Sequence, residues 1–234
     1  MARNDIDAET ALRSAIWQVL EDGRIKINRG EHYASDRLHP YVEVDKEGCL
    51  RTVGKPKTAE TLLDMYGDPL ERAASEFCLD VKLIGAVVIT ESGAVKGTFE
   101  RDIVSERKES GFVSWDKTPS RGSGGLGQCL LTTFRAVVKK YGREADFRDP
   151  WGNVREPNFG DLAVPEWSIW GCAGFLRMLA DEYDTEDPIL LTSGYNTGGL
   201  YASSSNDFRL RANGGNDRFM KHAAYSNDLA AVLG

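Results

Sequence analysis

Cysteine and histidine are scarce in this sequence, and their scarcity argues against several kinds of site. The 234 residues include four cysteines and three histidines, all widely separated. No C-x-x-C pair occurs, so neither a zinc site nor a Ser-His-Asp triad is well supported, and we expect no metal and no cofactor. The scattered cysteines leave disulfides open, but reduced and mostly buried thiols are the simpler interpretation. The residues concerned are Cys49, Cys78, Cys129, Cys172, His32, His39 and His222.

An excess of positive charge and long apolar runs are also missing. Lysine and arginine number 29 against 36 aspartates and glutamates, a formal net charge of −7. No global basic field therefore recruits nucleic acid. No apolar run is as long as a membrane span, so none is expected. The first ten residues, MARNDIDAET, contain no apolar signal-peptide core, so we expect a protein made in the cytoplasm without a signal peptide.

What is present is a series of amphipathic patterns that predicts a mainly α (α+β) fold. Apolar side chains recur at helical spacing, and several runs begin at a proline or end at a glycine. Residues 41–54 are typical of a β-hairpin, with two β-rich runs around a turn. Residues 94–124 and 198–217 are polar and irregular, so we predict connections there. The predicted helices are 8–22 with Gly23 as its stop, one starting at Asp68-Pro69, 81–90 capped by Asp80, 128–142, 164–183, one starting at Asp187-Pro188, and a weak helix at 218–233.

The tripeptide Glu-Ser-Gly occurs at Glu91 and at Glu109, in two different settings. Glu91 ends the apolar helix after Asp80, and Gly93 is expected to stop that helix. Burial there disfavours the ionised carboxylate and raises its pKa, as a general acid for glycoside cleavage requires. The structural alternative is a helix-end glutamate that caps the helix or pairs with an arginine. Glu109 lies among charged residues that cannot desolvate it, so we choose Glu91.

Two downstream motifs have the residue types of a ligand site. In SGGLGQCL, Gly125 and Gly127 let the backbone approach a ligand closely, and Gln128 offers a donor and an acceptor. In SGYNTGG, Tyr195 and Asn196 stand at a predicted helix end before a glycine loop. Taken alone, the first motif is equally compatible with a helix entry, and the second with a tyrosine anchored by its hydroxyl.

In this chain order the three motifs resemble the soluble lytic transglycosylases, peptidoglycan-cleaving relatives of goose-type lysozyme. The family pattern is E-S-x, then G-L-M-Q, then A-Y-N-A-G. The methionine is replaced by Gly127 and the first alanine by Gly194, and Glu109 would give the compact spacing of the family. Some relatives carry long inserts here, often with an aromatic-Glu pair such as the one in TFERD (98–102). The matching residues are Glu91-Ser92-Gly93, Gly125-Leu126-Gly127-Gln128 and Gly194-Tyr195-Asn196-Thr197-Gly198.

The resemblance covers roughly residues 68–200. It implies a lysozyme-like catalytic domain at 68–234. Residues 1–67 are then an N-terminal helix and β-hairpin, either an accessory element or part of the same lobe. The implied partner is the glycan strand of peptidoglycan, and we expect a monomer.

The resemblance also implies a mechanism and a set of site residues. Glu91 protonates the glycosidic oxygen between MurNAc and GlcNAc, then accepts the proton of the MurNAc 6-hydroxyl as a 1,6-anhydro ring closes. Tyr195 is implied at the cleavage point as the second catalytic residue. The implied substrate-binding residues are Ser92, Ser123, Gly125, Gln128 and Asn196. Candidates for sugar stacking are Trp115, Trp151, Trp167 and Trp170, of which we expect Trp167 and Trp170 to face the core instead.

Other interpretations stay open at this point. A goose-type muramidase would need a second carboxylate to activate water, and Glu100, Asp102 and Asp116 are available. A non-catalytic glycan-binding or virion protein on the same scaffold is another alternative, and a chitin- or chitosan-acting enzyme a more distant one. A wall-degrading enzyme without a signal peptide suggests a phage endolysin released through membrane holes, or a virion component.

Overall fold

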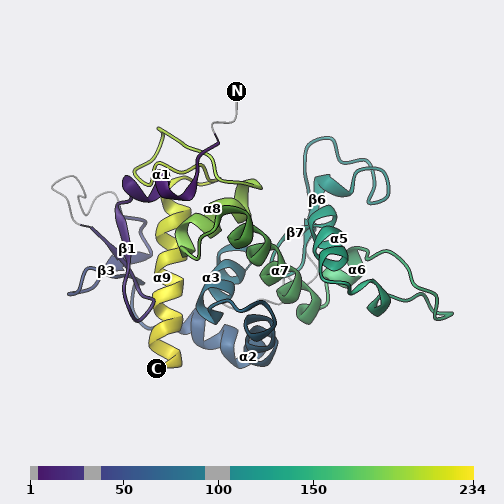
Figure 1. Cartoon of the computed structure of the whole chain (residues 1–234). Coiled ribbons are helices and arrows are strands. Elements are labelled where there is room, and N and C mark those ends of the chain that lie inside the picture. Colours follow the sequence, from purple (N-terminus) through teal and green to yellow (C-terminus); the bar gives the residue numbers. More distant parts are fainter. Residues whose placement is uncertain (1–4, 29–37, 93–105) are drawn as a thin grey trace.

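The computed structural model describes residues 5–28, 38–92 and 106–234, and its fold is mainly helical (Figure 1). About 51% of it is helix, accompanied by small antiparallel sheets, which confirms the predicted fold class. The helices are α1 (Ala8–Arg13), α2 (Lys57–Phe77), α3 (Val81–Glu91), α5 (Leu131–Lys140), α6 (Phe159–Leu162), α7 (Pro165–Tyr183), α8 (Pro188–Thr197) and α9 (Asn216–Leu233). The strands are β1 (Trp17–Val19), β2 (Ile25–Ile27), β3 (Val42–Val44), β4 (Leu50–Thr52), β5 (Glu106–Lys108), β6 (Gly122–Gly124) and β7 (Cys129–Leu130).

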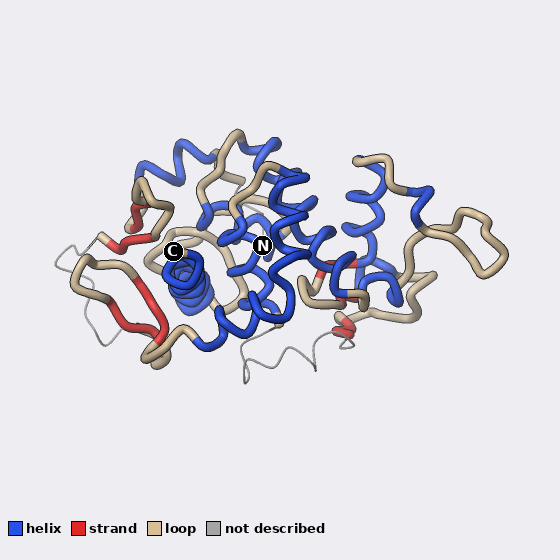
Figure 2. The backbone as a smooth tube through the Cα atoms, turned by 90° about the horizontal axis from the view of Figure 1, so that it is seen from below, coloured by secondary structure: helices blue, strands red, loops and turns tan. Residues whose placement is uncertain are grey.

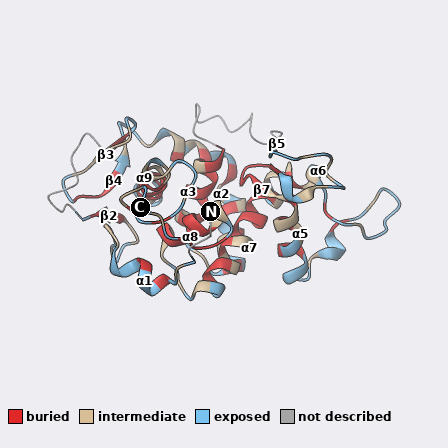
Figure 3. Ribbon diagram, turned by 90° about the horizontal axis from the view of Figure 1, so that it is seen from above, coloured by how far each residue is buried: buried red, intermediate tan, exposed pale blue. Residues whose placement is uncertain are grey.

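The core is built around α3, which packs against α2, α7 and α9. Nearly every residue of α3 is buried, as its apolar sequence predicted, and Asp80 caps it by accepting from the Lys82 amide. Figure 3 shows many buried residues along α3 and α7. A side chain at Gly85 would meet Leu229 Cδ1 at 2.7 Å, so this glycine permits the close approach of α9. The final helix, predicted to be weak, is therefore one of the main core elements.

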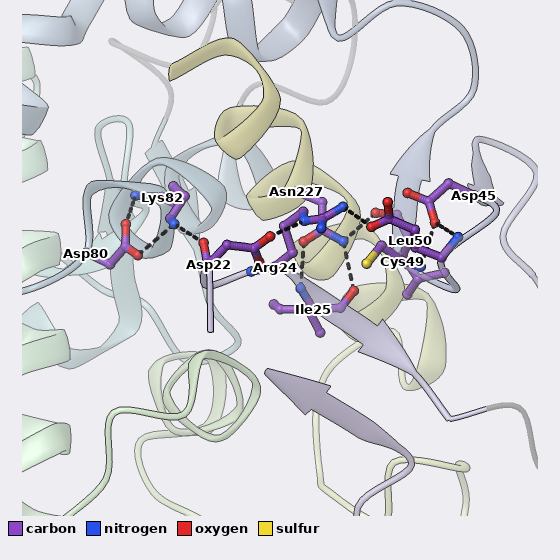
Figure 4. A network of polar contacts seen from close by, with 10 residues as sticks. Asp22, Arg24, Ile25, Asp45, Cys49, Leu50, Asp80, Lys82 and Asn227 are labelled. Carbon is purple, nitrogen blue, oxygen red and sulfur yellow. Dashed lines mark hydrogen bonds and ion pairs between the residues drawn. The ribbon is translucent and has the colours of Figure 1, made fainter. Parts of the chain in front are cut away.

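Two short hairpins, β1–β2 and β3–β4, are fastened to α9 by polar side chains. Asn227 accepts from the Ile25 amide and donates to the carbonyls of Ile25 and Leu50, at 2.7, 2.8 and 2.6 Å (Figure 4). Asp228 accepts from the Thr52 amide and hydroxyl. Isolated two-stranded hairpins are marginally stable in water, so these bonds to a buried helix stabilise them. The hairpin predicted at 41–54 is confirmed, with Val42 opposite Thr52.

The helix predicted at 8–22 is wrong beyond its first turns. The α1 helix ends at Arg13, and Trp17 begins strand β1. The indole of Trp17 is buried, stacks on Phe208 and donates to Asp187 Oδ2 at 2.9 Å. These distant contacts outweigh the local helical spacing. Gly23, expected as a helix stop, lies instead in the β1–β2 turn at φ +80°.

The helix predicted to start at Asp68 starts eleven residues earlier, at Lys57. It is kinked at Tyr66, whose φ of −138° is not helical. Pro69 explains the kink, because its ring clashes with the backbone in the preceding turn and it has no amide to donate. The Asp68-Pro69 signal therefore marks a kink inside α2, and the division at residues 67 and 68 falls within this helix.

The irregular connection predicted at 94–124 contains strands β5 and β6 in its described part, and β6 also pairs with β7 just beyond it, which makes a three-stranded sheet. Glycines at both ends of β6 let aromatic rings pack directly on the strand. A Cβ at Gly122 would lie 2.3 Å from the Trp115 ring, and one at Gly124 would lie 2.1 Å from the Phe159 ring. These two rings stack on each other at 4.8 Å between centroids. A strand made of glycine and serine has no apolar alternation, so the pattern did not reveal it.

The remaining helices match their predictions closely. The α7 helix begins with Pro165 at its first turn and ends at Tyr183, and α8 follows the Asp187 cap. The α5 helix begins three residues later than predicted, because Gln128 has a φ of +46° and residues 129–130 form β7.

All four cysteines are free, and three are buried, as expected. Within the described ranges, no helix combines the length and apolar character that crossing a membrane requires.

Candidate active site

Glu91 lies in the last turn of α3 and is only 8% exposed. The predicted burial of this glutamate is therefore correct. Its Oε1 accepts from Arg218 Nη1 of α9 at 2.6 Å, and the Arg218 side chain is 13% exposed. The backbone carbonyl of Glu91 accepts from Arg107 Nη2 at 3.3 Å. No described residue bonds to the second carboxylate oxygen, Oε2. Glu91 thus has one oxygen fixed by a cation and one left for other chemistry.

Arg218 also connects Glu91 to the loop that follows α8. Its Nε donates to the Asn213 carbonyl at 3.1 Å. The amide of Asn213 in turn donates to Asn196 Oδ1 at 2.7 Å. Asn196, predicted as a substrate-binding residue, therefore uses its side-chain oxygen to hold this loop. The result is a chain of contacts from α8 through the loop and α9 to the carboxylate on α3.

His222 lies one turn beyond Arg218 on α9 and is fully buried. Burial and, to a smaller extent, the nearby Arg218 charge lower its pKa to about 3. Neither ring nitrogen has a hydrogen-bond partner among the described residues. The histidine is therefore neutral at ordinary pH, and it is Arg218 that carries the positive charge paired with Glu91.

The segment 122–129 is buried along its whole length and folds into a tight turn. Gly125 has a φ of +70°, and a Cβ there would lie 2.0 Å from the Leu162 carbonyl oxygen, so no other residue fits. The Gly127 amide donates to Ser168 Oγ at 3.1 Å. Gln128 Nε2 donates to the Gly125 carbonyl at 2.8 Å, and Ser123 Oγ donates weakly to Gln128 Oε1 at 3.5 Å. Ser123, Gly125 and Gln128 thus form one bonded unit.

Tyr195 connects α8 to this turn. Its hydroxyl donates to the Gly127 carbonyl at 2.7 Å. Burial raises its pKa well above 10, and the buried thiols of Cys172 and Cys129 and the charge of Glu91 add to this rise. Tyr195 therefore stays neutral, and it lies close enough to Glu91 to be influenced by its charge.

The three predicted motifs consequently meet at one place in the fold. Glu91 lies on α3, the 123–128 turn leads from β6 to β7, and Tyr195 lies on α8. The Tyr195 hydroxyl bonds to the turn, and the charge of Glu91 acts on Tyr195. Ser92 differs, because its hydroxyl donates to the Val88 carbonyl of its own helix at 2.8 Å. The predicted stop at Gly93 lies outside the described residues, where the helix has already ended at Glu91.

The competing carboxylates have different positions. Glu109 is exposed in the β5–β6 connection, where its amide donates to the Arg121 carbonyl. Asp116 is also exposed. Glu100 and Asp102 lie outside the described residues. Glu109 therefore has the solvated setting that its charged neighbours indicated.

The tryptophans divide into packed and exposed residues. Trp167 and Trp170 pack on the main core as expected, and Trp170 Nε1 donates to Glu76 Oε1 at 2.9 Å. Trp115 is half-buried against Phe159. Trp151 is 84% exposed.

Arg218 and Ser168 are the site residues that the sequence did not indicate. Buried carboxylates generally need a cation, so pairing with an arginine was the structural alternative to a catalytic role for Glu91. Nothing in the sequence near Glu91 indicates which of the 29 lysines and arginines pairs with it, and Arg218 is 127 positions away. Ser168 is a serine inside an amphipathic helix, which carries no signal by itself.

The described residues contain no cluster of three or more histidine, cysteine, aspartate or glutamate side chains suited to a metal ion. Comparisons with protein-family models, with curated proteins and with solved structures find no match for this chain.

Proposed function

We propose that this protein is a lytic transglycosylase that cleaves the glycan strand of peptidoglycan, with Glu91 as its acid and base. The observation that carries the proposal is the position of Glu91. It is a buried carboxylate at the end of an apolar helix, near a half-buried tyrosine whose hydroxyl bonds to a glycine-rich turn. Buried carboxyl groups of this kind are typical of glycosidase acids. The sequence resemblance of these three segments to the family adds to the argument.

The proposed reaction uses one carboxyl group twice. Glu91 first gives its proton to the glycosidic oxygen between MurNAc and GlcNAc, and the C1–O bond breaks. The carboxylate then takes the proton of the MurNAc 6-hydroxyl, whose oxygen bonds to C1 and forms the 1,6-anhydro ring. No water is consumed, so no second carboxylate is required.

Arg218 has a defined part in this proposal. It holds Oε1, which leaves Oε2 to carry the proton toward the substrate. A guanidinium beside a carboxylate favours the charged form, so Arg218 stabilises the carboxylate that the first step leaves behind. The first step needs the protonated acid, and a substrate that loosens the ion pair would favour it. Arg218 is therefore expected to set the balance between the two steps.

Tyr195 and the 123–128 turn support the substrate in this proposal. The turn has a rigid backbone because Ser168, Tyr195 and its own glutamine side chain fix it. An N-acetyl group bound there would meet backbone groups that need no rearrangement. Tyr195 positions the turn through the Gly127 carbonyl and lies near the carboxyl group.

Mass spectrometry of purified peptidoglycan after digestion tests the proposal. The expected products are muropeptides with 1,6-anhydro-MurNAc ends, and Glu91→Gln protein should release none. Reducing MurNAc ends would identify a muramidase that uses water instead. Release of neither product by well-folded protein, with glycan binding retained, would indicate a non-catalytic binding protein.

A further inference from the structure

A narrow arm, residues 147–157, projects from the molecule between α5 and α6 (Figures 1 and 2). Its tip is fastened by Asp149, whose carboxylate accepts from the Trp151 amide, the Asn153 amide and the Asn153 side chain at 2.9, 2.8 and 3.0 Å. The Asn153 side chain is the main cause that lowers the pKa of Asp149. Arg148 donates to the Gly152 carbonyl at 2.7 Å. The arm therefore has a defined shape although it is exposed.

Trp151 stands at the tip of this arm with 84% of its surface exposed. The turn that carries it is closed by Gly152, which has a φ of +88° and donates its amide to the Asp149 carbonyl. Exposing a whole indole to water is unfavourable, and nothing in the core needs this residue. A rigid turn that displays a large aromatic ring is a recurrent device for binding, because the ring loses little freedom on contact.

A groove of about 460 Å³ lies at the base of the arm, between its returning segment and α5. Val154 and Pro157 give it apolar surface, and polar groups surround them. Two of its cations are already paired, Arg135 with Glu156 at 3.1 Å and Arg155 with Asp161 at 2.6 Å. The remaining lining residues are Ala136, Val138, Lys139 and Glu144. Apolar walls with a few polar groups are the usual composition of a small-ligand site.

We propose that the arm and this groove form a second glycan-binding site, with Trp151 as the platform on which a sugar ring stacks. An indole face fits the C–H face of a β-linked sugar, and the polar groups that line the groove suit its hydroxyl and amide groups. A stable protein partner would need roughly 800 Å² on this side, far more apolar surface than one ring on a narrow arm supplies. Glycan therefore fits better than a folded partner.

This site would anchor the protein on the polymer that Glu91 acts on, so its biological meaning rests on the proposed function. An anchor outside the reacting centre increases the time spent on a long strand through effective concentration. It should matter for the cleavage of insoluble peptidoglycan and little for the turnover of a short fragment. Its loss should therefore weaken binding to the polymer without changing turnover of short substrates.

The test uses the full chain with Glu91→Gln, so that substrate is not consumed, alone and combined with Trp151→Ala or Trp151→Phe. Binding is measured by co-sedimentation with purified peptidoglycan and by NMR titration with a soluble N-acetylglucosamine pentamer. Trp151→Ala should weaken both by about tenfold, the size of one good aromatic contact, and Trp151→Phe should restore most of it. The Trp151 amide, not its side chain, bonds to Asp149, so the alanine variant keeps the turn.

Tyr41→Ala is the matched control, because this tyrosine is 72% exposed and lies on the N-terminal hairpin rather than the arm. It should leave both affinities unchanged. Equal binding by Trp151→Ala and the parent would overturn the proposal. So would a loss confined to peptidoglycan with normal pentamer binding, which would indicate a peptide or protein ligand. If the active protein makes no anhydro ends but pentamer binding still depends on Trp151, the glycan site stands and the proposed catalysis fails.

Discussion

Arg218 Nη1 lies 2.6 Å from Glu91 Oε1, and this buried ion pair joins the C-terminal end of α3 to the first turn of α9. The two residues are 127 positions apart in the chain. A second contact of the guanidinium, with the Asn213 carbonyl, ties the preceding loop to the same place. One side chain therefore joins the candidate acid to two other segments. Buried pairs of this kind are costly to break from either side, because the remaining charge is left without a partner.

Glu91→Gln should reduce kcat by roughly 10²–10⁴-fold, the usual contribution of a general acid, since an amide of nearly equal size delivers no proton. The protein should still fold, with a lower melting temperature because Arg218 loses its ionic partner. Glu109→Gln is the matched control and should keep most of its activity, since Glu109 is exposed. Turnover on purified peptidoglycan and circular dichroism check both points. The reverse result would make Glu109 the acid.

Arg218→Gln should lower the free energy of unfolding by about 3–5 kcal/mol, as expected when one partner of a buried pair is removed. Arg218→Lys keeps the charge and should behave more like the parent protein. Denaturant unfolding measures the stability of each variant, and kcat/KM on purified peptidoglycan measures its activity. A destabilised variant with unchanged kcat/KM would limit Arg218 to a structural role.

Tyr195→Phe should lower both stability and turnover. It removes the bond to the Gly127 carbonyl, worth about 1 kcal/mol, and loosens the 123–128 turn. Tyr183→Phe is the control, because the Tyr183 hydroxyl accepts from the Leu200 amide at 3.2 Å, away from this turn. Both variants should lose similar stability, but only Tyr195→Phe should lose kcat. Equal activity of the two at a temperature where both are folded would make Tyr195 a structural anchor only.

The neutral, buried His222 should make the protein less stable in acid. Its pKa is about 3 in the folded chain and near the ordinary 6.5 when unfolded, so between these values the unfolded chain binds more protons. Its contribution is complete above about pH 6.5 and falls by about 1.4 kcal/mol per pH unit as the pH decreases toward 3. His222→Met removes the titrating group. Urea unfolding of both proteins at several pH values should show this extra slope in the parent alone, and parallel curves would contradict it.

The sequence by itself determined those parts of the molecule that depend on neighbouring residues. The Asp80 cap and the continuous apolar run specify α3, and Pro165 together with helical spacing specifies α7. The turn at Asp45–Gly48 specifies the 41–54 hairpin. The burial of Glu91 follows from its place at the end of an apolar helix. Each of these features arises within about one or two helical turns of chain, where propensity, capping and periodicity act.

Only the tertiary structure decided which distant groups meet. Trp17 lies in a strand despite the helical spacing around it, because its ring stacks on Phe208 and bonds to Asp187. The glycines of β6 form a strand because two aromatic rings pack directly on them. The choice of Arg218 as the partner of Glu91 depends on how α9 packs against α3, which Gly85 permits. Contacts across more than a hundred residues leave no periodic trace in the sequence, since they arise from packing and from the need to pair buried charge.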